Sequence, residues 1–314
     1  MKFCVIITTK DRPEMLKKLL ESIEKNQVKP NLLSIVSSGI DVKDIICSHN
    51  INLKIVHKHL NESGQVLQRN KAISNLNEDF DYYVFLDDDV IVDKEIFLNL
   101  VKYISQNSES IGGIGLNLIE GDLKNKKFIR YSRIKNYSPV NILAGKVLNS
   151  GRNVPYLGVN KIKQVMWLNG LSVWTHPVIS NFQHIQMGNK YAAAEDLIFS
   201  YEVGKNLKLY FHPGLKVQNQ WDGDGMKVSL DMYRTVWQHK LYFILTNKEM
   251  KLWLFILDNV FSIFIHLISI VKADYKTKFL IIIYQLRFIY VIVRKRNEFT
   301  KNESTQKLLL NKLL

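Results

Sequence analysis

Apolar and polar positions follow two different periods in the first two thirds of the chain. Short apolar runs indicate buried strands, and apolar residues three and four positions apart indicate helices. Strands are predicted at residues 3–9, 32–36, 53–56, 111–118, 165–170 and 172–174, and another ends at Asp87. Helices are predicted between the earlier strands at residues 13–25, 41–48, 63–76 and 93–105. This alternation favours an α/β domain with a parallel sheet and right-handed crossovers, over residues 1–225.

The pattern changes in the last part of the chain, residues 226–314. Three helical segments are predicted there, at residues 226–246, 252–271 and 279–293, and the last two are largely apolar. Polar residues interrupt the second segment and the third is short, whereas a spanning helix needs about 20 nearly uncharged residues. Basic residues flank both segments, as in helices that lie on anionic lipid. We predict a helical appendage with a peripheral membrane contact; a cap on the fold or a contact with a second subunit is the alternative.

Three consecutive carboxylates, Asp87, Asp88 and Asp89, follow an apolar strand. Acids packed so closely repel one another, and a compensating positive charge is expected beside them. Mg²⁺ and Mn²⁺ prefer carboxylate oxygens, and open α/β sheets bind ligands at the carboxyl ends of their strands. The run therefore predicts a divalent metal site, with an acidic turn as the structural alternative.

A second acidic pair, Glu195 and Asp196, precedes an apolar segment. A positioned carboxylate can act as a general base, provided that it faces the first acidic run. Acids are also favoured at a helix N-terminus by the helix dipole, so a structural role is the alternative.

The formal net charge of +14 favours an anionic partner. Residues 124–135 are rich in basic side chains interleaved with aromatic ones, which suits nucleic acid, a phosphorylated acceptor or a solvated loop. No nucleic-acid-binding motif accompanies them, and such a function leaves the two acidic clusters unexplained, so we expect no specific nucleic acid partner. Cys4 and Cys47 are predicted to be buried free thiols; with no signal peptide before the first strand, they favour a cytoplasmic protein.

Short motifs occur in a fixed order between residues 3 and 221. They are VIITTKDRP at 5–13, NESG at 61–64, RNKA at 69–72, DDD at 87–89, WLNG at 167–170 and ED at 195–196. The series resembles that of the inverting, nucleotide-sugar-dependent glycosyltransferases of family 2, which have the GT-A fold. Each motif alone is weak, and their common order makes the resemblance specific.

The resemblance implies a Rossmann-like, mostly parallel sheet flanked by helices, with the helical appendage behind it. It implies an enzyme that transfers a hexosyl or related sugar from a nucleotide-sugar donor to a glycan or lipid-linked acceptor. Such a reaction is expected at the inner face of the plasma membrane, in bacterial surface polysaccharide biosynthesis. The expected cofactor is Mn²⁺ or Mg²⁺.

The resemblance also implies roles for single residues. Asp89, together with Asp87, matches the DXD-type motif and would hold the metal. Asp196 matches the catalytic base, and Glu195 is the alternative base. The residues expected to bind the donor are Thr9, Arg12, Ser37, Arg69, Asp87 and Asp88.

Two departures from the family pattern leave alternatives open. Ser37 stands where members usually carry an acid for the nucleotide base, so a thymidine or guanosine nucleotide competes with uridine. Asn219 stands where a histidine often completes the metal site; the other candidates for that ligand are His212, Asp222 and Asp224. His212 also fits a structural histidine bonded to backbone at a strand end. Both departures keep a non-catalytic relative as a further alternative.

Overall fold

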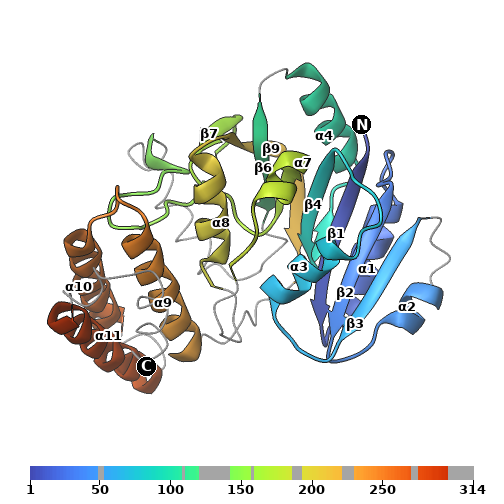
Figure 1. Cartoon of the computed structure of the whole chain (residues 1–314). Coiled ribbons are helices and arrows are strands. Elements are labelled where there is room, and N and C mark those ends of the chain that lie inside the picture. The colour runs from blue at the N-terminus through green and yellow to red at the C-terminus, as the bar shows by residue number, and fades with distance from the viewer. Residues whose placement is uncertain are drawn as a thin grey trace. The chain divides into compact units, whose positions relative to one another are not determined.

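The computed structural model describes residues 1–48, 53–107, 110–119, 142–156, 159–185, 193–220, 230–269 and 275–295. The chain divides into two compact units (Figure 1). Unit 1 comprises Met1–Lys146 and Pro155–Gly225, and unit 2 comprises Val147–Val154 and Met226–Leu314. The short segment 147–154 thus packs with the C-terminal helices, although it lies inside the predicted α/β domain in sequence.

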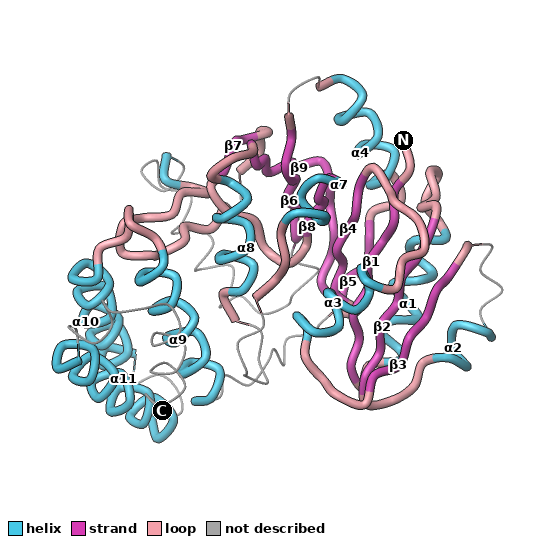
Figure 2. The backbone as a smooth tube through the Cα atoms, viewed as in Figure 1, coloured by secondary structure: helices cyan, strands magenta, loops and turns pink. Residues whose placement is uncertain are grey.

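Unit 1 is built on one nine-stranded sheet, whose main path runs β3-β2-β1-β4-β8-β6-β9-β5, with β7 paired to β9 (Figure 2). The strands are β1 (Phe3–Lys10), β2 (Leu32–Ser38), β3 (Ile55–Leu60), β4 (Tyr82–Asp87), β5 (Val90–Val92), β6 (Ile111–Ile119), β7 (Lys163–Val165), β8 (Ser172–Thr175) and β9 (Lys208–Asn219). The predicted parallel arrangement is present in β3-β2-β1-β4. Farther along, β8 runs antiparallel to β4 and β6, whereas β6 and β9 are parallel.

The helices of unit 1 are α1 (Pro13–Glu24), α2 (Lys43–Ser48), α3 (Gln65–Ser74), α4 (Ile96–Gln106), α7 (His176–Asn181) and α8 (Glu195–Gly204). The sequence explains why α1 begins at Pro13. Proline is favoured in the first turn of a helix, because the N–H that it lacks would have no partner within the helix there. Its buried side chains include Leu16, Leu19, Leu20 and Ile23, which share one helical face.

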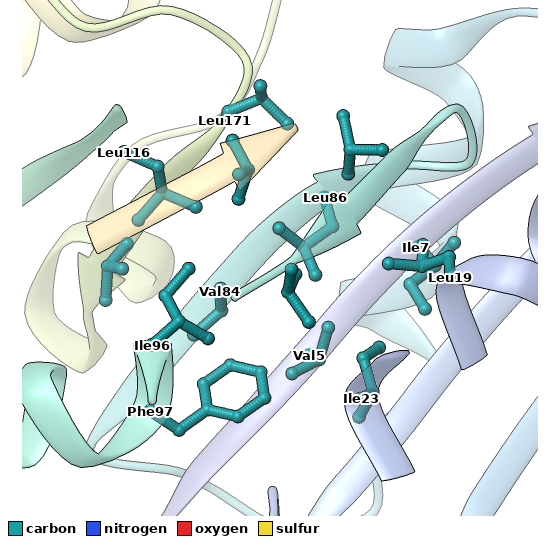
Figure 3. Packing of buried hydrophobic residues seen from close by; sticks show 14 of the residues in the cluster. Val5, Ile7, Leu19, Ile23, Val84, Leu86, Ile96, Phe97, Leu116 and Leu171 are labelled. Atoms are coloured by element: carbon teal, nitrogen blue, oxygen red, sulfur yellow. The ribbon is translucent and has the colours of Figure 1, made fainter. Parts of the chain in front are cut away.

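Alternation along the central strands produces two cores, one on each face of the sheet. Phe3, Val5 and Ile7 of β1 point to a core shared with α1 and α4, part of which is drawn in Figure 3. Cys4 and Ile6 point to the opposite core, which contains residues of α3, α7 and α8. The same alternation governs β4, and it decides where the acids at its end project.

The structure departs locally from the predicted elements. The strand predicted at 165–170 ends at Val165, because the next backbone N–H, that of Met166, is donated to the carbonyl of Gly145 instead of a strand neighbour. The strand predicted at 53–56 runs from Ile55 to Leu60. Cys4 is buried as predicted, but the prediction for Cys47 is wrong, since α2 leaves this side chain exposed.

Unit 2 contains the helices α9 (Leu230–Thr246), α10 (Leu252–Ser269) and α11 (Tyr275–Lys295). These correspond to the three helical segments predicted from the sequence. Among the described residues, none of the helices combines the length and the apolar character that crossing a bilayer demands.

Candidate active site

The three consecutive aspartates project to two sides of the sheet. Asp88 lies on the side of α1, where it accepts hydrogen bonds from Thr9 Oγ1 at 2.7 Å and from Arg12 Nη1 at 3.1 Å. Arg12 Nη1 also contacts Asp89 Oδ2 at 3.0 Å. Arg12 immediately precedes α1, so the start of this helix supplies the positive charge for two of the three acids.

Asp87 lies on the opposite side, facing α3. Its Oδ1 accepts hydrogen bonds from Gln65 Nε2 at 2.8 Å and from Arg69 Nη2 at 3.3 Å. Burial raises the pKa of Asp87 to about 6, although the guanidinium of Arg69 acts in the opposite direction. The compensating charge expected for the acidic run is thus provided, in the protein itself, by two arginines on opposite faces.

Arg69 also joins the two acidic clusters predicted from the sequence. Its Nη1 lies 2.9 Å from Asp196 Oδ1 and 3.7 Å from Glu195 Oε1. The side chain is only 2% exposed. Burial alone would lower the pKa of Arg69, but the three carboxylates outweigh burial and raise it. Asp196 thus lies close to the first acidic run, as a base in this position would have to, because the buried guanidinium of Arg69 contacts both Asp196 and Asp87.

Gly170 allows this guanidinium to take its place. A Cβ added at Gly170 would lie 2.6 Å from Arg69 Nη2 and 3.1 Å from Asp196 Oδ2, closer than ordinary contacts allow. A glycine here lets the backbone approach a charged pair closely. Gly170, the end of the WLNG motif, thus leaves open the space that the guanidinium of Arg69 occupies.

Glu195 and Asp196 are adjacent in sequence but differ in environment. Both lie in the first turn of α8, behind Ala194, whose φ of 63° is left-handed. The Glu195 side chain is 5% exposed and that of Asp196 is 27% exposed. Burial, and then the charge of Asp196, raise the pKa of Glu195 to about 8. Glu195 therefore favours its protonated form more than an ordinary carboxyl group does, whereas the side chain of Asp196 is the more accessible of the two beside Arg69.

Ser37 lies next to Thr9 in the β1–β2 register, but its hydroxyl is occupied elsewhere. It is fully buried and lies 2.8 Å from His57 Nε2 and 3.0 Å from His59 Nδ1. Both histidines belong to β3, and Asp41 Oδ1 lies 3.8 Å from His57 Nε2. The structure therefore places Ser37 in a histidine cluster. Among the described residues, its hydroxyl is bonded to these histidines and not to Asp87, Asp88 or Asp89.

The oxygen atoms at the end of β4 suit a hard cation in chemical type. Asp87 and Asp89 retain 33% and 21% of their side-chain surface, so both are accessible to an ion. Asp88 is buried and bonded to Thr9 and Arg12, which gives it an anchoring position. In the part of the chain that the structure describes, no group of three or more acidic, histidine or cysteine side chains is gathered to hold a metal.

Two of the four candidates for a further metal ligand, His212 and Asn219, lie among the described residues. His212 Nδ1 accepts a hydrogen bond from the Gly214 backbone at 3.1 Å, and its ring packs against Tyr103, as the structural alternative predicts. Asn219 pairs with Val90 in the β5–β9 register, directly after Asp89. Asp222 and Asp224 lie outside the described residues, as does the basic segment 124–135.

Sequence reasoning missed three polar residues that build the site. Gln65, at the start of α3, binds Asp87. Gln220 donates to the backbone carbonyls of Asp88 and Val90 and so fixes the turn of the acidic run. His184 stacks on Phe199 beside Arg69. For Gln65 the one available signal was its position just after the NESG motif; the other two have no local signature.

The nine-stranded sheet with its flanking helices has the GT-A fold of the glycosyltransferases that it matches. TarS of S. aureus matches with a TM-score of 0.58 at 14% identity, over 100% of this chain and 52% of TarS. The 1–349 fragment of TarS, crystallised with UDP-GlcNAc, gives 0.55 at 16% identity, over 100% and 87% of the two chains. GalNAc-T7, crystallised with UDP, GalNAc and Mn²⁺, gives 0.56 at 13% identity, over 79% and 49%. The chain thus spans about half of the full TarS and GalNAc-T7 chains.

Part of the sequence also matches a family model. Residues 4–149 match the family described as glycosyl transferase family 2. The resemblance inferred from the ordered motifs, and the predicted GT-A fold with C-terminal helices, are therefore confirmed. A search of curated proteins by sequence gave no match.

Proposed function

We propose that this protein is an inverting glycosyltransferase that moves a sugar from a nucleotide-sugar donor to a glycan or lipid-linked acceptor. The main support for this proposal is the pair of contacts that Arg69 makes with the two acidic clusters. One buried guanidinium binds Asp87, at the end of the acidic run, and Asp196, on a helix more than a hundred residues later. A donor-binding cluster and an accessible base in one place are what a single displacement requires.

Asp196 is the proposed base. Inversion is one displacement, in which an acceptor hydroxyl loses its proton while attacking the anomeric carbon opposite the departing nucleoside diphosphate. A base must be ionised and must reach that hydroxyl. Asp196 is accessible and held by Arg69, whereas Glu195 is buried and its raised pKa favours the protonated form, which cannot accept a proton. This difference favours Asp196 over Glu195.

The donor side is proposed to include Thr9, Arg12, Asp87 and Asp88, which the hydrogen bonds described above fix around the end of β4. Arg12 is cationic and partly exposed, and can meet a phosphate. Ser37 would contribute only if its hydroxyl left the two histidines, so the base of the nucleotide stays open among uridine, thymidine and guanosine.

Asp89 and Asp87 are the proposed ligands of Mn²⁺ or Mg²⁺. When bound, such an ion neutralises negative charge that develops on the leaving diphosphate. Asp88 would keep the run in place through Thr9 and Arg12. That GalNAc-T7 was crystallised with Mn²⁺ supports this proposal by analogy of fold alone.

The proposal extends to the acceptor and to the place of the reaction in the cell. A lipid-linked glycan in bacterial surface polysaccharide assembly, at the inner face of the plasma membrane, agrees with the basic charge of the chain and its apolar C-terminal helices. UDP and UDP-GlcNAc were crystallised with TarS, which supports a nucleotide-sugar donor.

Donor hydrolysis tests the proposal without knowledge of the acceptor. The full chain is incubated with Mn²⁺ and a panel of uridine, thymidine and guanosine diphosphate sugars, and the released nucleoside diphosphate is measured. We expect turnover of one donor class, lost in Asp196→Asn and kept in the control Glu202→Gln, whose exposed carboxylate lies on the same helix and pairs with Lys205. Hydrolysis of no donor, or equal hydrolysis by Asp196→Asn, would overturn the proposal.

A further inference from the structure

The described helices of unit 2 pack through apolar side chains, and a buried polar pair joins α10 to α11. Phe288 of α11 packs against Phe255 of α10 and against Trp237 of α9. Gln285 Nε2 donates to Asn259 Oδ1 at 3.0 Å and to the Asn259 carbonyl at 3.1 Å, and both side chains are buried. This pair fixes the rotation of α10 against α11, which are neighbours in unit 2 (Figure 1). It therefore also fixes which faces of the two helices point outward.

The outward face of α10 is apolar. Large side chains three or four residues apart are exposed along it, as on one face of a helix. They are Trp253, Leu257, Phe261, Phe264, Ile265 and Ile268. The one acid of this helix, Asp258, is paired with Arg152 Nη2 at 2.6 Å. An exposed apolar stripe of this length indicates a surface that contacts another molecule or lipid.

The outward face of α11 is apolar and basic. Its exposed apolar residues have the same helical spacing and are Phe279, Leu280, Ile283, Leu286, Tyr290 and Val293. Arg287 and Arg294 are exposed on the same face, seven residues apart. The segment Tyr275–Lys295 contains no acidic residue at all.

We propose that these two outward faces form a docking surface for an anionic lipid bilayer, with α10 and α11 lying in the plane of the headgroups. Apolar side chains then enter the acyl boundary while the arginines meet lipid phosphates. Trp253 and Tyr290 are of the type that prefers the boundary between headgroups and acyl chains. This surface specifies the membrane contact of the proposed enzyme, although lipid binding itself requires no transfer activity.

The arginines favour lipid over a second copy of the chain. A two-fold interface through the same faces would bury Arg287 and Arg294 among apolar side chains, and a buried charge without a partner is costly. No acid on either face is available to pair with them, since Asp258 already binds Arg152. Lipid phosphates supply the missing negative charge and leave the apolar side chains to the acyl region.

Vesicle sedimentation of the full chain tests the surface. We expect the protein to pellet with vesicles of phosphatidylglycerol and phosphatidylcholine, and to remain largely in solution with phosphatidylcholine alone. Arg287→Gln with Arg294→Gln should weaken binding to anionic vesicles roughly 30-fold at low salt, from the typical contribution of two basic side chains. Phe261→Glu with Phe264→Glu should abolish the binding that persists at high salt, because apolar burial is not screened.

Ile162→Glu is the matched control, since it also replaces an exposed large apolar residue, but in unit 1. Circular dichroism and thermal unfolding verify that each variant is folded. The proposal is overturned if the wild type ignores anionic vesicles, or if Phe261→Glu with Phe264→Glu binds as the control does. It is also overturned if those substitutions convert an oligomer to a monomer by light scattering and leave vesicle binding unchanged. Donor hydrolysis is measured separately, so failure of the docking surface and of the proposed function are distinguishable.

Discussion

Replacement of Glu195 by glutamine tests the charge state of the candidate active site. The substitution keeps the shape of the side chain and removes its ability to lose a proton. Glu195 is buried, and burial together with Asp196 raises its pKa from 4.5 to about 8. Glu195→Gln therefore imitates the protonated form, which the raised pKa favours in the wild type.

The sign and size of the effect on stability follow from this shift. Because the folded pKa exceeds the unfolded one, the stability that the proton contributes is fully present below about pH 4.5 and is lost as the pH rises through about 8. Between about pH 6 and about pH 9 the wild type should lose about 3 kcal/mol of unfolding free energy from this group. Glu195→Gln carries no such group, so its stability should rise relative to the wild type by about that amount.

The assay is urea unfolding of both proteins at the two pH values, in metal-free buffer without nucleotide. Asp87 also has a raised pKa, about 6, so its titration contributes to the profiles of both proteins mainly at the lower pH value. Glu202→Gln, an exposed position on α8, should follow the wild-type profile. Parallel profiles for the wild type and Glu195→Gln would show that Glu195 is ionised in the folded protein, and the assignment of Asp196 as the accessible base would lose its physical basis.

The remaining predictions concern the roles at the site. Asp196→Asn should lower turnover by about 10²–10⁴-fold with donor affinity near normal by calorimetry, and the roles are exchanged if Glu195→Gln loses activity instead. Asp89→Ala should remove the Mn²⁺ dependence of donor binding in a folded protein; calorimetry that finds unchanged dependence contradicts it. Gly170→Ala should push the guanidinium of Arg69 off its partners and cost about 1–3 kcal/mol in urea unfolding, with a larger loss of activity. Wild-type stability and turnover in that variant would mean that Arg69 relocates freely.

The sequence by itself predicted most of the elements and the two acidic clusters from which the candidate site is built. Local periodicity predicts the helix from Pro13 and the strand that ends at Asp87, because neighbours within a few residues fix both patterns. It also indicates that Asp87–Asp89 lie at the carboxyl end of a strand and that Glu195 and Asp196 begin a helix. The order of these motifs was enough to recognise the resemblance to family 2 glycosyltransferases, which the match over residues 4–149 confirms.

Only the tertiary structure decided how these residues meet. Arg69 and Asp196 are separated by 127 positions, and no local pattern records that they touch. The pleat sends Asp87 to α3 and Asp88 to α1, so one acidic run is neutralised from two sides. Burial then separates two adjacent acids, since packing covers Glu195 and leaves Asp196 accessible. Solvation and charge pairing depend on atoms brought together by the fold, and a sequence pattern contains only atoms joined along the chain.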